Sequence, residues 1–372
     1  MRPFLILFVW TTVTATAGSA VAWIGTSDRG PIKSKGIYRV ELDLETGQLT
    51  EPSLATEVRR PGFLALDPSG ERLFAACELP SGQGGVAAYR IDDEKATLTL
   101  INSQATGDGG AAHLGTDRTG RLLFSAQYGG GSVAVFPVAE DGTIQERSML
   151  VEHEGSGPNK ARQEGPHPHW VGVDPENRFL FVPDLGTDRI VIYRIDHDAA
   201  RITRHGEALC PTGGGPRHFK FHPSGLYAYV VNELHMSVRV FRYNAEAGEL
   251  TAMQTLPTLP EYYREGFNSC SEIRVHPTGR FVYVANRGHD SITAFAVSGE
   301  TGRLRFVERE SIRGAMPRNF NLDPSGKWLV AAGKDSNSLA SFSVDLDRGS
   351  LLFSRHMVAC PVPMCVVLQD LN

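Results

Sequence analysis

The sequence predicts an all-β fold, a seven-bladed β-propeller with four antiparallel strands in each blade. Two observations carry this prediction: a turn motif that recurs roughly every 50 residues, and an alternating apolar strand that follows soon after each copy. The composition agrees, because the 372 residues include 39 glycines and 22 prolines. Units of this length that each hold four short strands are typical of propeller blades.

The turn motif is Asp/His-Pro-x-Gly, or a close variant, placed between two apolar stretches. These residue types suit a tight type I turn that joins two antiparallel strands. We therefore expect each copy to link the first and second strands of one blade. The six copies begin at Asp67, Asp117, Asp174, His222, His276 and Asp323.

The third strand of each blade has the clearest pattern, because apolar and polar residues alternate along it. A weaker fourth strand follows, often after a glycine turn, as in residues 245–256. The third strands are expected at residues 86–92, 133–138, 190–196, 238–243, 292–297 and 339–344.

The two ends of the chain supply the seventh blade. Residues 36–43 and 46–56 resemble a third and a fourth strand, and a second strand precedes them, but no first strand does. Residues 361–370 resemble a first strand with nothing after it. We therefore expect the C-terminal strand to complete the N-terminal blade and close the ring, which removes the exposed edges of an open array.

Residues 1–17 have the pattern of an export signal peptide, which predicts a periplasmic or extracellular protein. Arg2 precedes an apolar core at residues 4–13, and small residues offer cleavage sites between 17 and 22. We favour cleavage after Ala17, because the following residues are needed as a strand; the propeller then covers residues 18–372. The alternative is an uncleaved anchor, but the second half is rich in threonine, serine and glycine and would span a membrane poorly.

Charge and cysteine content narrow the range of partners. The net charge is −5 and no cluster of lysine or arginine stands out, which argues against a nucleic-acid surface. The five cysteines show neither a C-x-x-C motif nor zinc-like spacing, so we expect buried free thiols. One disulfide between Cys360 and Cys365 is the alternative.

Polar residues recur where a first strand begins and where a second strand ends. Because these two strands are antiparallel, both positions lie on one rim of the central channel, where a pocket is expected. His218 is one of these rim residues. Eight other rim residues are the candidates for the functional site. These are Tyr128, His167, His169, Arg217, Glu233, Arg287, Arg318 and Asn319.

The sequence resembles the seven-bladed lactonase family, which includes propeller-type bacterial 6-phosphogluconolactonases and fungal carboxymuconate lactonizing enzymes. The resemblance covers essentially the whole chain after the signal peptide and implies a catalytic cluster of His169, Arg217, Glu233 and Arg287. The rim geometry selects the same four residues. The resemblance rests on residues 25–49, 127–138, 157–169, 215–225, 230–234 and 281–292.

This set of residues suits the hydrolysis of a sugar lactone, either aldonic or 6-phosphogluconic. We expect His169 to act as the general base with Glu233 as its acid/base partner. Arg217 and Arg287 are expected to bind the carbonyl oxyanion and an acidic group of the substrate. The predicted substrate-binding residues are His167, Tyr128, Arg318 and Asn319.

Two other functions stay open: a cycloisomerase that closes an unsaturated diacid on the same site, and a non-catalytic binding propeller. A metal site at His167 and His169 is also conceivable, since residues two apart share one face of a strand. We expect no metal and no cofactor, because the neighbouring arginines would repel a dication. His222 and His276 take the place of Asp in the turn motif, so we expect them to be structural and to lie on the opposite face.

Overall fold

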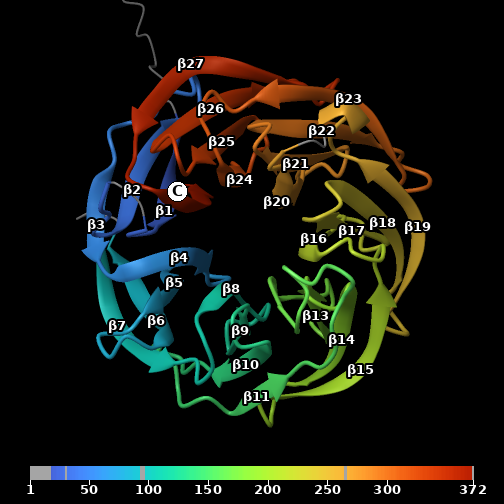
Figure 1. Cartoon of the computed structure of the whole chain (residues 1–372). Helices are drawn as coiled ribbons and strands as arrows, with labels where there is room; N and C mark the ends of the chain where they lie inside the picture. Colours follow the sequence, from blue (N-terminus) through green and yellow to red (C-terminus); the bar gives the residue numbers. More distant parts are fainter. Residues whose placement is uncertain (1–17, 30–31, 93–96, 264–265, 371–372) are drawn as a thin grey trace, which may run out of the picture.

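In the computed structural model, seven four-stranded sheets stand around a central axis, as the sequence predicts (Figure 1). The structure describes residues 18–29, 32–92, 97–263 and 266–370. All strand pairs within the sheets are antiparallel, and the sheets are arranged as the blades of a propeller. Within these ranges no helix has the length and hydropathy needed to cross a membrane.

Blade 1 combines the two ends of the chain, which confirms the predicted closure of the ring. Its innermost strand, β28 (Pro363–Asp370), pairs with β1 (Ser19–Thr26), followed outward by β2 (Gly36–Asp43) and β3 (Ser53–Glu57). In Figure 1 the red C-terminal strand lies beside the blue N-terminal strands. The N-terminal strand β1 and the C-terminal strand β28 are therefore held together by backbone hydrogen bonds.

The other six blades take their strands in chain order from the channel outward. Blade 2 contains β4 (Arg59–Leu66), β5 (Arg72–Glu78), β6 (Gly84–Asp92) and β7 (Thr97–Ala105). Blade 3 contains β8 (Ala111–Thr116), β9 (Leu122–Gln127), β10 (Ser132–Pro137) and β11 (Met149–Glu152). Blade 4 contains β12 (Gly172–Val173), β13 (Phe179–Asp184), β14 (Arg189–Asp196) and β15 (Arg201–Leu209).

The last three blades follow the same plan. Blade 5 contains β16 (Pro216–Phe221), β17 (Tyr227–Asn232), β18 (Ser237–Asn244) and β19 (Glu249–Pro257). Blade 6 follows the 3-10 helix η1 (Glu261–Tyr263) and contains β20 (Ser269–Val275), β21 (Phe281–Arg287), β22 (Ser291–Val297) and β23 (Leu304–Ser311). Blade 7 contains β24 (Pro317–Leu322), β25 (Trp328–Gly333), β26 (Ser338–Val344) and β27 (Leu351–Ala359).

The hydrophobic core lies between neighbouring blades, because each sheet buries both of its faces. Phe181 of blade 4, for example, stacks on Phe219 of blade 5 with ring centroids 5.4 Å apart and planes 3° apart. Both rings are fully buried. Contacts of this kind hold each blade at a set angle to the next, so they also set the positions of side chains at the channel mouth.

The Asp/His-Pro-x-Gly turns join consecutive blades as well as consecutive strands. Nε2–H of His222 donates to the carbonyl oxygen of Gly279 (3.0 Å), and Nε2–H of His276 donates to that of Gly326 (2.9 Å). Gly279 has a φ of +74°, and a Cβ there would lie 2.5 Å from the His222 ring. The structural role expected for both histidines is confirmed.

All five cysteines are buried free thiols, as expected. Cys360 and Cys365 are among them, so the alternative disulfide between these two residues does not form. Burial raises the pKa of Cys365 to about 12, which makes this thiol unreactive at neutral pH.

The predicted signal peptide, residues 1–17, lies outside the described residues. The other possible cleavage region, residues 20–22, falls inside β1, where these residues are completely buried. Cleavage there would remove a section of β1 that pairs with both of its neighbours.

Candidate active site

A pocket of about 460 Å³ lies at the predicted rim of the channel. Every one of the seven blades contributes to its wall, so the pocket brings together residues from across the described chain. The pocket is lined by Gly62, Phe63, Ala111, Ala112, Tyr128, Arg162, His169, Arg217, His218, Glu233, Phe267, Arg287, Arg318 and Met364.

Glu233, which follows β17, is the point where three arginines meet. Its Oε2 accepts a hydrogen bond from Arg217 (2.9 Å), and its Oε1 lies 2.7 Å from Arg162 Nη2 and 3.0 Å from Arg287 Nη2. Burial raises the pKa of this carboxyl, but Arg287 and Arg217 outweigh burial and hold it well below its ordinary value. Glu233 is therefore ionised at neutral pH, and its surroundings suit a role in holding the arginines better than the expected role in proton transfer.

His169 lies just ahead of β12, in a proline-rich segment tied to blade 4 by its backbone. Its N–H donates to the carbonyl oxygen of Pro183 (3.1 Å). Arg217 Nη1 donates to its Nε2. Burial, and after it the charge of Arg217, lowers the pKa of His169 well below 6.5, so the ring is neutral at pH 7. A neutral ring that accepts at Nε2 has the lone pair a general base needs.

The segment around His169 is less regular than the sequence predicts. The rim pattern predicts that His169 opens the first strand of blade 4, but β12 contains only two residues, Gly172–Val173. Upstream the pairing is limited to an isolated bridge between Pro168 and Asp184. Pro183 of β13 has no N–H to give to the ladder, and the N–H of Val171 donates to Nδ1 of His113 (3.3 Å) instead, so the pairing is interrupted between Pro168 and Gly172.

Arg217 of β16 connects Glu233 to His169. Its side chain is 4% exposed, and its Nε donates to the carbonyl oxygen of Ser271 (2.9 Å). Burial lowers its pKa to about 10, so the guanidinium remains charged at neutral pH. Arg287, at the end of β21, is anchored in the same way, with Nη2 donating to the carbonyl oxygen of Cys270 (2.8 Å).

Arg318 and Asn319 are neighbours in β24 but have different surroundings. Arg318 lines the pocket, and among the described residues it has no hydrogen-bond or ion-pair partner. Burial and the charges of nearby arginines lower its pKa to about 9. Asn319 is 0% exposed, bonds to Glu272 and accepts from the N–H of Val366 (2.9 Å). The structure thus places Asn319 outside the pocket wall, where it connects β24 to β28, because successive side chains of a strand point to opposite sides.

Tyr128 lies in the turn between β9 and β10 and forms part of the pocket wall. His167 lies behind it: the two rings stack with centroids 4.4 Å apart, and Nδ1–H of His167 donates to the carbonyl oxygen of Tyr128 (2.7 Å). His167 is therefore placed to support Tyr128 rather than to line the pocket. His167 and His169 have different partners, and the described part of the chain contains no group of three potential metal ligands.

Arg162 and His218 also line the pocket, although sequence patterns predict no role for either. Arg162 bonds to Glu233 and lies 3.4 Å from the Tyr128 hydroxyl. It occupies the loop between β11 and β12, where strand periodicity carries no information, although it lies within the family-like segment 157–169. The His218 ring centroid is 5.4 Å from that of His169, and burial lowers the pKa of His218 to about 4.

Comparisons with known proteins agree with this architecture. The family model described as "Lactonase, 7-bladed beta-propeller" matches residues 21–368. A Bacillus subtilis protein named 6-phosphogluconolactonase is 39% identical over 346 residues, which cover 93% of this chain and 97% of the relative. The solved structure of a Pseudomonas aeruginosa periplasmic gluconolactonase is 30% identical, with a TM-score of 0.88 over 95% of this chain and 99% of the other. The chain belongs to the seven-bladed β-propeller lactonase family.

Proposed function

We propose that this protein hydrolyses a sugar lactone, adding water to the cyclic ester to form the open-chain hydroxy acid. One observation carries the proposal: a neutral histidine, His169, contacts a buried arginine, Arg217, inside a pocket where four arginines face a single carboxylate. Relatives named 6-phosphogluconolactonase and gluconolactonase support the same reaction.

The first step is the attack of water on the ester carbonyl carbon. His169 accepts a proton from the water through Nε2, while the water oxygen forms a bond to the carbon. Arg217 donates to the carbonyl oxygen as it becomes negative, a contact worth about 3 kcal/mol in the transition state. In the free site, one N–H of Arg217 donates to Nε2 of His169. When substrate binds, the same N–H donates to the carbonyl oxygen instead, which frees the lone pair of His169 for the water proton.

The second step breaks the ring. The tetrahedral intermediate re-forms the carbonyl and expels the ring oxygen as an alkoxide, which takes the proton from His169. The base returns to its neutral form, and the net change is the addition of one water molecule. Glu233 remains ionised throughout and keeps Arg217 and Arg287 in position.

The surplus of arginines suits the negative charge that the reaction produces, first on the oxyanion and then on the carboxylate product. Arg318 has no partner among the described residues and is therefore free to pair with an acidic group of the substrate, such as the phosphate of a 6-phosphogluconic lactone. The same surplus would suit an unsaturated diacid, so a cycloisomerase remains the second candidate.

A direct test measures acid release in a pH-stat with the protein lacking residues 1–17. The lactones are glucono-δ-lactone and 6-phosphoglucono-δ-lactone, each with and without a chelator. We expect hydrolysis above the spontaneous rate, no effect of the chelator, and a loss of about 10²- to 10⁴-fold in kcat/KM for His169→Ala. His167→Ala is the matched control and should have a smaller effect, because His167 acts through Tyr128.

Other outcomes separate the alternatives. If neither lactone is hydrolysed but carboxymuconate is cyclised, the cycloisomerase replaces the lactonase. If no turnover occurs with any of these substrates, the proposal of an enzyme fails and a binding role takes its place.

We also propose that the protein is exported. The pattern of residues 1–17 and the periplasmic relative from Pseudomonas aeruginosa support this location. Expression of the full-length chain, followed by fractionation and N-terminal sequencing, should recover a mature protein beginning at Gly18 in the periplasm or medium. Recovery of uncleaved chain in the cytoplasm would contradict it.

A further inference from the structure

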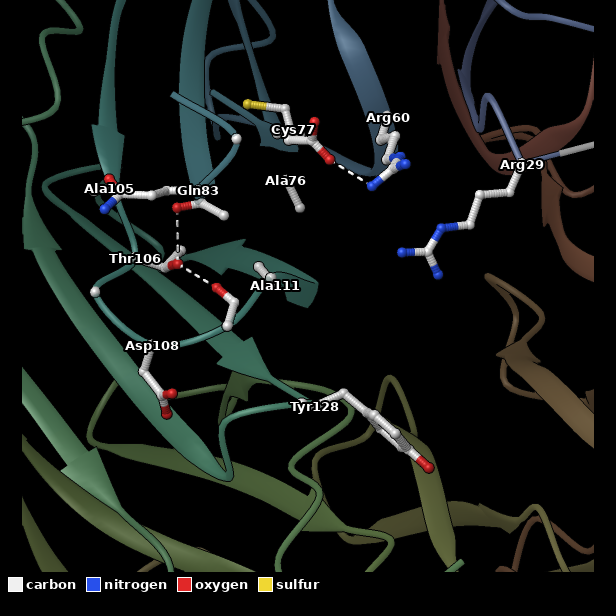
Figure 2. Close-up of a pocket in the computed structure, with 17 residues that line it drawn as sticks. Arg29, Arg60, Ala76, Cys77, Gln83, Ala105, Thr106, Asp108, Ala111 and Tyr128 are labelled. Carbon is white, nitrogen blue, oxygen red and sulfur yellow. Dashed lines mark hydrogen bonds and ion pairs between the residues drawn. The ribbon is translucent and has the colours of Figure 1, made fainter. Parts of the chain in front are cut away.

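A second, larger pocket adjoins the candidate active site. It has a volume of about 740 Å³ and shares Ala111 and Tyr128 with the first pocket. Figure 2 shows residues from three regions around it: Arg29 after β1, Arg60 and Cys77 of blade 2, and Asp108 with Tyr128 of blade 3. Because Ala111 and Tyr128 line both pockets, the two pockets are direct neighbours that meet beside the Tyr128 side chain.

The two pockets differ in charge. The charged side chains that line the second pocket are Arg29, Arg60, Glu78 and Asp108, two of each sign. Arg60 is already neutralised, because its guanidinium lies 2.6 Å from Asp28 and 2.5 Å from Glu78. In the active-site pocket, four arginines face one carboxylate. An acidic group would therefore bind in the active site, and the second pocket suits an uncharged polar group.

The second pocket also offers unused hydrogen-bonding groups of both kinds. Among the described residues, neither the half-buried carboxylate of Asp108 nor the exposed guanidinium of Arg29 has a side-chain partner. The carboxylate can only accept hydrogen bonds and the guanidinium can only donate them. Sugar hydroxyls do both, so they can pair with either group.

We propose that the second pocket is a subsite for an uncharged sugar unit attached to the lactone ring. This inference rests on the proposed lactonase function and narrows its substrate class to lactones of disaccharide aldonic acids. The lactone ring occupies the pocket of His169 and Arg217, the glycosidic link passes Tyr128, and the second ring lies near Asp108 and Arg29. Both volumes fall within the range of about 300–1,000 Å³ that is usual for small-molecule sites.

The test compares glucono-δ-lactone with cellobiono-δ-lactone as substrates of the wild type and of a variant with a blocked subsite. Gly110 lines only the second pocket, its backbone does not need glycine, and a Cβ there would meet nothing within 4 Å. Gly110→Phe therefore introduces a large side chain at the wall of the second pocket without backbone strain. Gly299→Phe is the matched control, because Gly299 is equally exposed and unhindered but lies after β22 in blade 6.

We expect the wild type to show a kcat/KM about tenfold higher for the disaccharide lactone, which corresponds to about 1.4 kcal/mol of additional binding. Gly110→Phe should lower kcat/KM for the disaccharide lactone at least tenfold and change kcat/KM for glucono-δ-lactone by less than twofold. Gly299→Phe should change neither. If the wild type hydrolyses these lactones, equal effects of Gly110→Phe on both, or no preference of the wild type for the disaccharide, would overturn the subsite.

A binding measurement separates this inference from the proposed function. Cellobionate and gluconate, the open-chain acids, are titrated calorimetrically into His169→Ala with and without Gly110→Phe. Tighter binding of cellobionate that Gly110→Phe abolishes would support the subsite even if the wild type hydrolysed neither lactone, and in that case only the proposed hydrolysis would fail. Equal binding of both acids by all variants would overturn the subsite, whatever the activity.

Discussion

Replacing Glu233 by Gln removes the one carboxylate among the described residues that line the active-site pocket, while preserving its shape. Arg162, Arg217 and Arg287 then lose a partner that lies 2.7–3.0 Å away, and they are left facing one another. Breaking a buried ion pair by removing one partner typically costs about 3–5 kcal/mol. We therefore expect Glu233→Gln to lower the free energy of unfolding by about 4 kcal/mol.

The expected shift in melting temperature follows from the size of the domain. An unfolding entropy of about 2.1 cal/mol/K per residue, over roughly 350 residues, gives about 0.7 kcal/mol/K. A loss of about 4 kcal/mol then lowers Tm by about 5 °C, which differential scanning calorimetry resolves easily. Activity should fall as well, because Arg217 would no longer be held against His169.

Glu164→Gln is the matched control, since it makes the same chemical change on a side chain that is 62% exposed near the same pocket. It should shift Tm by less than about 1 °C. The addition of phosphate should restore part of the stability of Glu233→Gln, because an anion can replace the missing carboxylate. If Glu233→Gln has the same Tm and the same kcat/KM as the wild type, the account of the site as an arginine cluster held by Glu233 is wrong.

Two further predictions concern charge in the pocket. Acidification should destabilise the protein, because burial lowers the pKa of His218 to about 4, against 6.5 in the unfolded chain. The contribution of this residue to stability is complete above about pH 7 and falls at lower pH, where the unfolded state takes up the proton first. At pH 5 the loss from this residue alone is about 2 kcal/mol. Urea unfolding at pH 7.5 and pH 5.0 measures this loss, and equal stability at both values would contradict it. Arg318→Ala should raise KM about 10- to 150-fold for 6-phosphoglucono-δ-lactone with kcat unchanged, since it removes a charged hydrogen bond worth about 1.5–3 kcal/mol. The same rise with glucono-δ-lactone would show that Arg318 acts on the ester instead of on an acidic group.

The fold could be predicted from the sequence because each blade is specified locally. Turn chemistry at Asp67 and its five counterparts, and alternation in strands such as 190–196, depend only on residues close together in the chain. Even the closure by residues 361–370 follows from counting strands, since each blade needs four. The two-residue strand β12 departs from the pattern where prolines interrupt the ladder.

The candidate site could be predicted only in part. The ends of strands indicate which residues reach the rim, and this rule led to His169, Arg217, Glu233 and Arg287, all of which line one pocket. It gave no information on Arg162, which lies in a loop, and it could not separate Asn319 from its neighbour in β24. Both outcomes depend on contacts between blades.

Local patterns in the chain were therefore enough to determine the number of blades, the order of their strands and the rim on which polar residues gather. Only the packing of the blades decided which of these side chains meet. Burial and neighbouring charge then decided the protonation state of each one. Glu233 is ionised because three arginines surround it, and His169 is neutral because it is buried beside Arg217. The physical reason is that turn and strand preferences depend on residues a few positions apart. Electrostatic and packing interactions depend on distance in space, so they also join residues that are far apart in the sequence.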